Sequence, residues 1–210
     1  MSSVAAARAL LAGLIEGGLT HLVLAPGSRS APLVHAAAEA EARGEVTLTV
    51  RIDERVAAFT ALGLATAGSG IVGVVTTSGT AVANLHPAAL EAAAARTPLI
   101  AITADRPAEL QGVGANQTVD QRGVFGAAPR WERTLEAGID PAGARAAGLA
   151  AAAAASGRRS GVPGLAHINV RFREPLTPPP GAAVPAPLGG GRGPESARVE
   201  GESRFGGVVV

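Results

Sequence analysis

The sequence predicts an α/β fold, a doubly wound, mostly parallel sheet of six strands with helices on both faces. Short apolar runs alternate with helical segments along the chain, which is typical of a parallel sheet covered on both sides. The chain has 210 residues, of which 47% are hydrophobic, enough to bury one sizeable core. Polar residues gather directly after the apolar runs, where such sheets bind ligands.

The expected strands are short apolar segments rich in valine, leucine and isoleucine and bounded by glycine, proline or polar residues. The first reads THLVLA, the second alternates in VTLTVR, and the third and fourth are IVGVVT and PLIAIT. A fifth follows a long polar loop, and the last reads LAHINVR. These six strands cover residues 20–25, 46–51, 71–76, 98–103, 131–136 and 165–171.

The expected helices separate these strands. Apolar residues recur at helical spacing in each, and the last helix consists mostly of alanine. The five helices cover residues 4–17, 31–43, 54–67, 80–95 and 141–156. The first of them favours an ordinary helix over a signal peptide, because its apolar centre, Ala9 to Ile15, is short and Glu16 follows it.

The composition excludes several classes of function. The net charge of +1 and the absence of lysine give no reason to expect a nucleic-acid partner or an anionic membrane. The absence of cysteine excludes a disulfide framework, a thiol nucleophile and a cysteine-ligated metal. No apolar stretch approaches the roughly 20 residues that span a bilayer. We therefore expect a cytoplasmic protein without a membrane partner.

The composition changes at Pro175. From there to Val210 the chain contains seven prolines and eight glycines, which is typical of a linker. We expect a folded domain over residues 1–176 and a Pro/Gly-rich linker over 177–210 that leads to domains absent from this chain.

Candidate functional residues follow four of the strands. The loops are Pro26-Gly27-Ser28-Arg29-Ser30, Asp53-Glu54-Arg55, Thr77-Ser78-Gly79-Thr80 and Ala104-Asp105-Arg106-Pro107. Taken singly, each loop is explained by helix capping, since Asp53, Ser78 and Thr80 are good N-caps. Four polar loops at one edge of a sheet favour a ligand site instead.

Two further features of the sequence are a glycine motif and a polar loop. Residues 68–73 match the dinucleotide fingerprint G-x-G-x-x-G, but they end a helix and enter a strand, the reverse of the order a pyrophosphate site needs. Asn116, Gln117 and Gln121 lie in a polar loop whose amides suit hydroxyl and carboxylate groups, or else form a turn. The four histidines, His21, His35, His86 and His167, lack metal-ligand spacing and are expected to pack.

Six segments occur in the order APGSRSAPL, RIDERVAAFTALGLA, VVTTSGTAVANLHPAALEA, PLIAITADRPAEL, GANQTVDQ and HINVRFREPL. Together they resemble the N-terminal pyrimidine-binding domain of the MenD family, the SEPHCHC synthases, over residues 4–176. The resemblance implies a thiamine-diphosphate-dependent transferase of menaquinone biosynthesis. Its members decarboxylate 2-oxoglutarate and add the product in a 1,4 sense to isochorismate. It also implies Mg²⁺ or Mn²⁺ held by a domain absent from this chain, and a homodimer or tetramer.

The resemblance implies a role for each matching residue. Glu54 is expected to be catalytic and to hydrogen-bond the cofactor's aminopyrimidine ring. The other cofactor-binding residues are expected to be Pro26, Gly27, Ser78, Gly79 and Thr80. The substrate-binding residues are expected to be Ser28, Arg29, Arg106, Asn116, Gln117 and Gln121, and none is a metal ligand.

Two other interpretations remain open. In the first, the chain is a stand-alone pyrimidine-domain subunit of a two-subunit thiamine-dependent 2-oxoacid decarboxylase. In the second, it is a doubly wound nucleotide-binding domain that does not bind thiamine. An in-frame coding sequence beyond Val210 that reached a GDG motif would exclude the stand-alone subunit.

Overall fold

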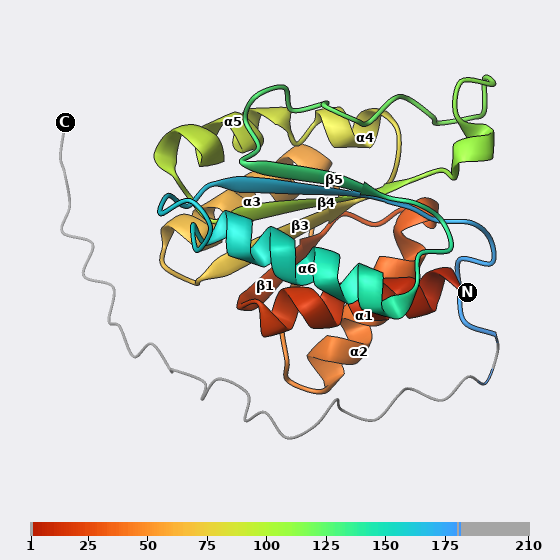
Figure 1. Ribbon diagram of the computed structural model, residues 1–210, viewed down its shortest axis with the longest axis horizontal. Helices are drawn as coiled ribbons and strands as arrows, with labels where there is room; N and C mark the ends of the chain where they lie inside the picture. The colour runs from red at the N-terminus through yellow and green to blue at the C-terminus, as the bar shows by residue number, and fades with distance from the viewer. Residues whose placement is uncertain (1, 180, 182–210) are drawn as a thin grey trace, which may run out of the picture.

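The computed structural model describes residues 2–179 and 181 and confirms the predicted α/β fold (Figure 1). Six strands form one sheet in the order β2-β1-β3-β4-β6-β5, and every neighbouring pair is parallel. Most of the predicted linker, residues 180 and 182–210, lies outside the described residues. The strands are β1 (Leu19–Leu24), β2 (Thr47–Val50), β3 (Ile71–Thr76), β4 (Leu99–Asp105), β5 (Trp131–Leu135) and β6 (Leu165–Arg171).

Helices cover both faces of the sheet (Figure 1). One face carries α1 (Ser3–Glu16), α2 (Ala31–Ala42) and α6 (Pro141–Ala155). The other carries α3 (Glu54–Thr66), α4 (Thr80–Ala83) and α5 (His86–Ala95). Two 3₁₀ turns, η1 (Ser28–Ser30) and η2 (Ala108–Leu110), follow β1 and β4.

The helix predicted over residues 80–95 is two helices, α4 and α5. Pro87 lies in the first turn of α5 and has no N–H to donate to a preceding carbonyl. The chain therefore ends α4 at Ala83 and starts again at His86, where proline is well tolerated.

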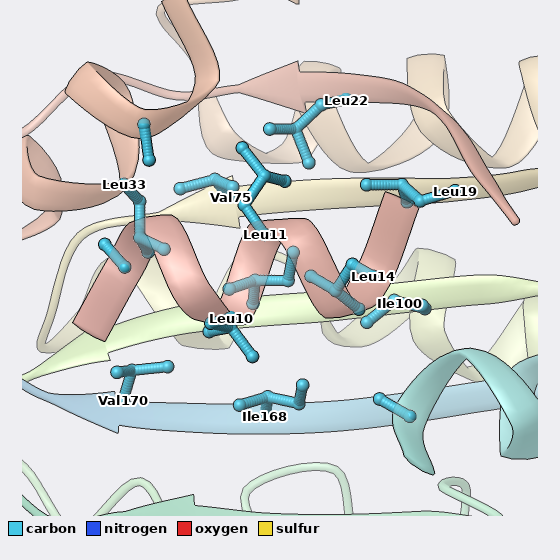
Figure 2. Packing of buried hydrophobic residues seen from close by; sticks show 14 of the residues in the cluster. Leu10, Leu11, Leu14, Leu19, Leu22, Leu33, Val75, Ile100, Ile168 and Val170 are labelled. Carbon is cyan, nitrogen blue, oxygen red and sulfur yellow. The ribbon is translucent and has the colours of Figure 1, made fainter. Parts of the chain in front are cut away.

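The strands divide their side chains between two apolar clusters. Leu22 and Leu24 of β1 belong to the cluster under α1, α2 and α6, whereas Val23 and the following Ala25 belong to the opposite cluster. This alternation follows from the two-residue period of a strand. Figure 2 shows leucines of α1 lying over the strands beside Ile100 and Ile168. Both faces of the sheet are therefore buried, as an all-parallel sheet requires.

Helices α1 and α6 pack closely because glycines face each other at their contact. A Cβ added to Gly148 would lie 2.4 Å from the carbonyl oxygen of Leu10, and one added to Gly13 would lie 2.1 Å from that of Arg145. Both contacts are to backbone, which cannot rotate away as a side chain can. The two glycines thus set the distance between the helices.

No helix in residues 2–179 combines the length and the apolar character that crossing a bilayer would need.

The close approach of α1 and α6 gives a stability prediction with a matched control. Gly148→Ala is expected to lower the free energy of unfolding by about 1–3 kcal/mol, because overpacking forces the backbone of α1 away. Gly63→Ala in α3, where no atom lies within 4 Å of the added Cβ, should be neutral or raise stability by up to about 1 kcal/mol. Urea unfolding of both variants measures the difference, and equal effects would contradict this packing.

Candidate functional site

The candidate site lies along the edge of the sheet where the parallel strands end. The predicted residues follow β1, β2, β3 and β4, and the segment after β6 joins them there. Because β2 and β3 flank β1 on opposite sides, the connections from β1 and β3 diverge at this edge. A crevice at such a switch point is where open α/β sheets bind ligands.

The loops after β1 and β3 approach each other closely. Gly27 has extended backbone, and a Cβ on it would lie 2.3 Å from the Cβ of Thr77. The loop then turns into η1, where the hydroxyl of Ser30 donates to the carbonyl of Gly27 at 2.9 Å. Pro26 and Ser28 are exposed on the same turn. The sequence Pro-Gly-Ser therefore brings backbone of two strand ends together and directs Arg29 back across the edge.

Arg29 is largely buried and incompletely paired. Its side chain is 11% exposed, and one guanidinium nitrogen donates to the carbonyl of Phe172 at 3.1 Å. The nearest carboxylate is Glu174, at 4.0 Å, and it is 78% exposed. The buried Nε has no hydrogen-bond partner among the described residues. Burial, and after it the positive charge of Arg106, lowers the pKa of Arg29. Such a guanidinium is well suited to bind an anion.

Arg106 joins the β3 turn to the polar loop. Its guanidinium donates both to the hydroxyl of Ser78 and to the carbonyl of Gln117, at 2.6 Å for the latter. The amide of Gln117 donates in turn to the carbonyl of Ser78 at 3.0 Å. The structure therefore brings together Ser78, Arg106 and Gln117, three predicted site residues from separate segments.

The turn at Gly79 depends on this contact. Gly79 has a φ of 82°, in the left-handed region that favours glycine, and Gln117 has a φ of 53°. A Cβ on Gly79 would lie 2.8 Å from the Cγ of Gln117. Gly79 is itself the N-cap of α4, so the capping role considered for Ser78 and Thr80 is wrong. Thr80 and Asn116 are exposed beside the turn.

Glu54 lies at the same edge, as the first residue of α3. Asp53 caps this helix, because its carboxylate accepts from the backbone N–H of Val56 at 3.0 Å. Glu54 is half-buried, and its carboxylate forms no hydrogen bond or ion pair with another described residue. No hydrogen bond or ion pair joins Glu54 to Arg29, which follows the neighbouring strand β1, or to Arg106, which follows β4 further along the sheet, among the described residues.

Gln121 lies beneath the edge rather than on it. It is 1% exposed, and its carbonyl accepts from the backbone N–H of Gly79 at 2.9 Å. Its amide nitrogen donates to the carbonyl of Ala104 at 3.1 Å and to the side-chain oxygen of Asn169 at 2.7 Å. Both ends of the side chain are thus used inside the protein. The bonds of Gln121 support the Gly79 turn from below, and the substrate contact predicted for this residue stays a prediction.

A buried polar layer, which the sequence did not predict, lies below these loops. Thr103, Asp105, His167 and Asn169 are each at most 1% exposed and lie in β4 and β6. The available signal was the presence of histidine and asparagine inside the apolar strand LAHINVR. His167 packs against Phe125, edge to face, with ring centroids 4.8 Å apart. Residues 2–179 contain no group of three His, Asp or Glu side chains that could hold a metal ion.

Comparison with known proteins identifies similar chains. Residues 4–124 match the family described as thiamine pyrophosphate enzyme, N-terminal TPP binding domain. The chain is 51% identical over 191 residues to the 2-succinyl-5-enolpyruvyl-6-hydroxy-3-cyclohexene-1-carboxylate synthase of Paenarthrobacter aurescens (strain TC1), covering 91% of this chain and 33% of that protein.

Further relatives carry the same name. The synthase of Kineococcus radiotolerans is 54% identical over 190 residues, covering 88% of this chain and 34% of that protein. The synthase of Rhodococcus opacus is 49% identical over 191 residues, which cover 89% of this chain and 35% of that protein. The chain thus spans about a third of the length of these relatives.

The buried layer predicts a pH dependence of stability. Contact with His167 is the largest cause that lowers the pKa of Glu132 below its ordinary 4.5, and the N–H of Gly123 adds to it. A lowered pKa stabilises the fold above about pH 4.5, and this contribution is lost as the pH falls through the lowered value. Glu132→Gln is therefore expected to weaken the dependence of unfolding free energy on pH below 4.5.

Urea unfolding between pH 7 and 3 measures this effect. Glu91→Gln, at an exposed position of α5, controls for the loss of one carboxylate. An acid-induced loss of stability that is as steep in Glu132→Gln as in the unaltered chain would contradict the assignment.

Proposed function

Because the chain belongs to the thiamine pyrophosphate enzymes, through their N-terminal TPP binding domain, we propose that it is the pyrimidine-binding part of a SEPHCHC synthase. The proposed reaction is the decarboxylation of 2-oxoglutarate and the 1,4-addition of the product to isochorismate. The observation that carries the substrate assignment is the largely buried Arg29, whose Nε has no hydrogen-bond partner in the described part of the chain and whose neighbour is a second cation, Arg106.

The chain's own residues fit the pyrimidine end of thiamine diphosphate. Gly27 and Gly79 leave no room for a Cβ because Thr77 and Gln117 pack against them, and this packing fixes the two turns that we propose approach the pyrimidine ring. Glu54 offers a half-buried carboxyl that no residue of the described chain pairs with, and it is suited to hold a proton at a ring nitrogen. When bound, thiamine diphosphate supplies the electron sink for decarboxylation and carbon–carbon bond formation. Pro26 beside Gly27, and Ser78 and Thr80 beside Gly79, are proposed to complete the contacts to the cofactor.

Arg29 and Arg106 are proposed to bind the carboxylates of isochorismate. Both guanidinium groups reach the same edge, and each is close enough to the other for repulsion to lower the pKa of Arg29. A carboxylate between them would accept hydrogen bonds from the two guanidinium groups and relieve that repulsion. Exposed turns beside the two arginines carry Ser28, Asn116 and Gln117. Their hydroxyl and amide groups are proposed to hydrogen-bond the remaining oxygens of the substrate.

The rest of the site is proposed to come from outside these residues. The diphosphate group and Mg²⁺ or Mn²⁺ would be held by another domain, which a homodimer or tetramer would supply across a subunit contact. The surface beside Glu54 supports this arrangement, because Ile52, Val56 and Phe59 are 85%, 46% and 44% exposed there. A cluster of exposed apolar side chains next to a functional carboxyl is typical of an interface.

Glu54 provides the first test. In the complete enzyme we expect carboligation of 2-oxoglutarate and isochorismate to require thiamine diphosphate and a divalent ion. Glu54→Gln should lower kcat by at least about a hundredfold, because the amide cannot exchange a proton with the ring. Glu91→Gln should keep the normal rate. Activity without thiamine diphosphate, or a near-normal rate in Glu54→Gln, would contradict the proposal.

Arg29 provides a second test that separates the two substrates. Arg29→Ala is expected to raise the KM for isochorismate about 10- to 100-fold, the cost of a lost charged hydrogen bond. The KM for 2-oxoglutarate should change much less. Arg159→Ala, exposed in the turn after α6 at the opposite end of the sheet, should change neither. Steady-state kinetics with each substrate varied in turn measures both KM values. Equal increases in the two KM values would contradict the carboxylate-binding role of Arg29.

A further inference from the structure

The buried side-chain amide of Asn169 lies between two parts of the candidate site, the Gly79 turn and the backbone of Arg106. Asn169 of β6 is fully buried, and its register partner in β4 is Thr103. Its Nδ2 donates to Asp105 Oδ2 at 3.0 Å. Its Oδ1 accepts from the amide of Gln121 at 2.7 Å and from the hydroxyl of Thr103 at 2.9 Å. The carboxylate of Asp105 only accepts hydrogen bonds, so the orientation of the amide follows from its partners.

Two chains of hydrogen bonds lead from Asn169 to the site. One passes through Gln121, whose carbonyl accepts from the backbone N–H of Gly79 at 2.9 Å. The other passes through Asp105, whose Oδ1 accepts from the backbone N–H of Arg106 at 2.7 Å. Gly79 forms the turn assigned to the cofactor and Arg106 carries a guanidinium assigned to the substrate. One side chain therefore connects the backbone of both.

We propose that Asn169 is a positioning residue that holds the Gly79 turn and the Arg106 backbone in fixed relation, so that cofactor and substrate meet in register. The link from position to catalysis rests on the proposed function; the link from Asn169 to the two backbone segments rests on the hydrogen bonds alone.

The partners of Asn169 explain why this position takes an amide. Two of them donate and one accepts, and only an amide offers an acceptor and a donor at this length. An apolar side chain would remove one hydrogen bond from each of Gln121, Thr103 and Asp105 in a buried layer, at a cost for each group. A carboxylate would face Asp105 at 3.0 Å, where two negative charges repel strongly.

A neighbouring residue provides a matched control. Thr76, at the end of β3, is also fully buried, but its hydroxyl has no hydrogen-bond partner among the described residues. Thr76→Val removes a buried polar group of the same sheet without removing a connection. If Asn169 acted only as a polar group in the core, the two positions would respond alike.

The test compares Asn169→Asp with Thr76→Val in the complete enzyme by amide hydrogen exchange and by kinetics. In Asn169→Asp, peptides containing residues 77–80 and 105–107 should exchange at least about tenfold faster, while α6 and β1 keep their protection. The KM for isochorismate and the thiamine diphosphate concentration for half-maximal activity should both rise about tenfold. The kcat at saturation should fall by less than about threefold. Thr76→Val should leave all these values unchanged.

Other results would overturn the proposal. Unchanged exchange at both segments would show that Asn169 does not hold them, and faster exchange throughout the chain would reduce its role to global stability. A fall in kcat with both binding constants unchanged would also contradict positioning. If Asn169→Asp does not fold, Asn169→Ser retains one hydroxyl for the network and should show smaller changes at the same two segments. Unaltered enzyme without activity would disprove the proposed function, and the exchange comparison would still decide the role of Asn169.

Discussion

The parallel direction of all six strands is the constraint on which the candidate site depends. When every strand runs the same way, every strand ends at one edge, and segments far apart in the sequence meet there. The hydroxyl of Ser78 and the carbonyl of Gln117 are 39 positions apart in the chain and 3.2 Å apart in space. Arg29 and the carbonyl of Phe172 are 143 positions apart and 3.1 Å apart. A single reversed strand would have moved its loop to the other end of the sheet.

Parallel strands must be buried on both faces, and this explains why so much of the fold could be predicted. A strand covered on both sides reads as a continuous apolar run, as IVGVVT and PLIAIT do, and its position in the sequence is plain. The break between α4 and α5 was less evident, because the alanines around Pro87 continue the helical pattern. The spatial order of the strands has no local signal, so the place of β6 between β4 and β5 could not be derived.

The site was predictable in part for the same reason. Strand direction gave the edge, and the resemblance gave candidate roles to the residues on it. Side-chain pairing was not predictable, because it depends on distances that only the fold sets. The shared loop predicts the same substrate role for Gln117 and Gln121, yet Gln117 is exposed at the edge and Gln121, four positions later, is buried beneath it. The role of Asn169 needed its three partners, which come from two other segments of the chain.

The charges at this edge are arranged so that a positive potential is left for a ligand. Asp105 is the buried carboxylate nearest to both arginines, but its oxygens accept from the backbone of Arg106 and from the amides of Gln111 and Asn169. It also lies 3.5 Å from Arg171, so its charge is already matched. Among residues 2–179, the guanidinium of Arg106 donates only to the neutral oxygens of Ser78 and Gln117.

Arg29 has an exposed carboxylate at 4.0 Å, a pairing that solvent screens. Two guanidinium groups that the described residues compensate only in part therefore lie at the same edge. Since burial makes that arrangement unfavourable without an anion, the same geometry that lowers the pKa of Arg29 should strengthen the binding of a dicarboxylate.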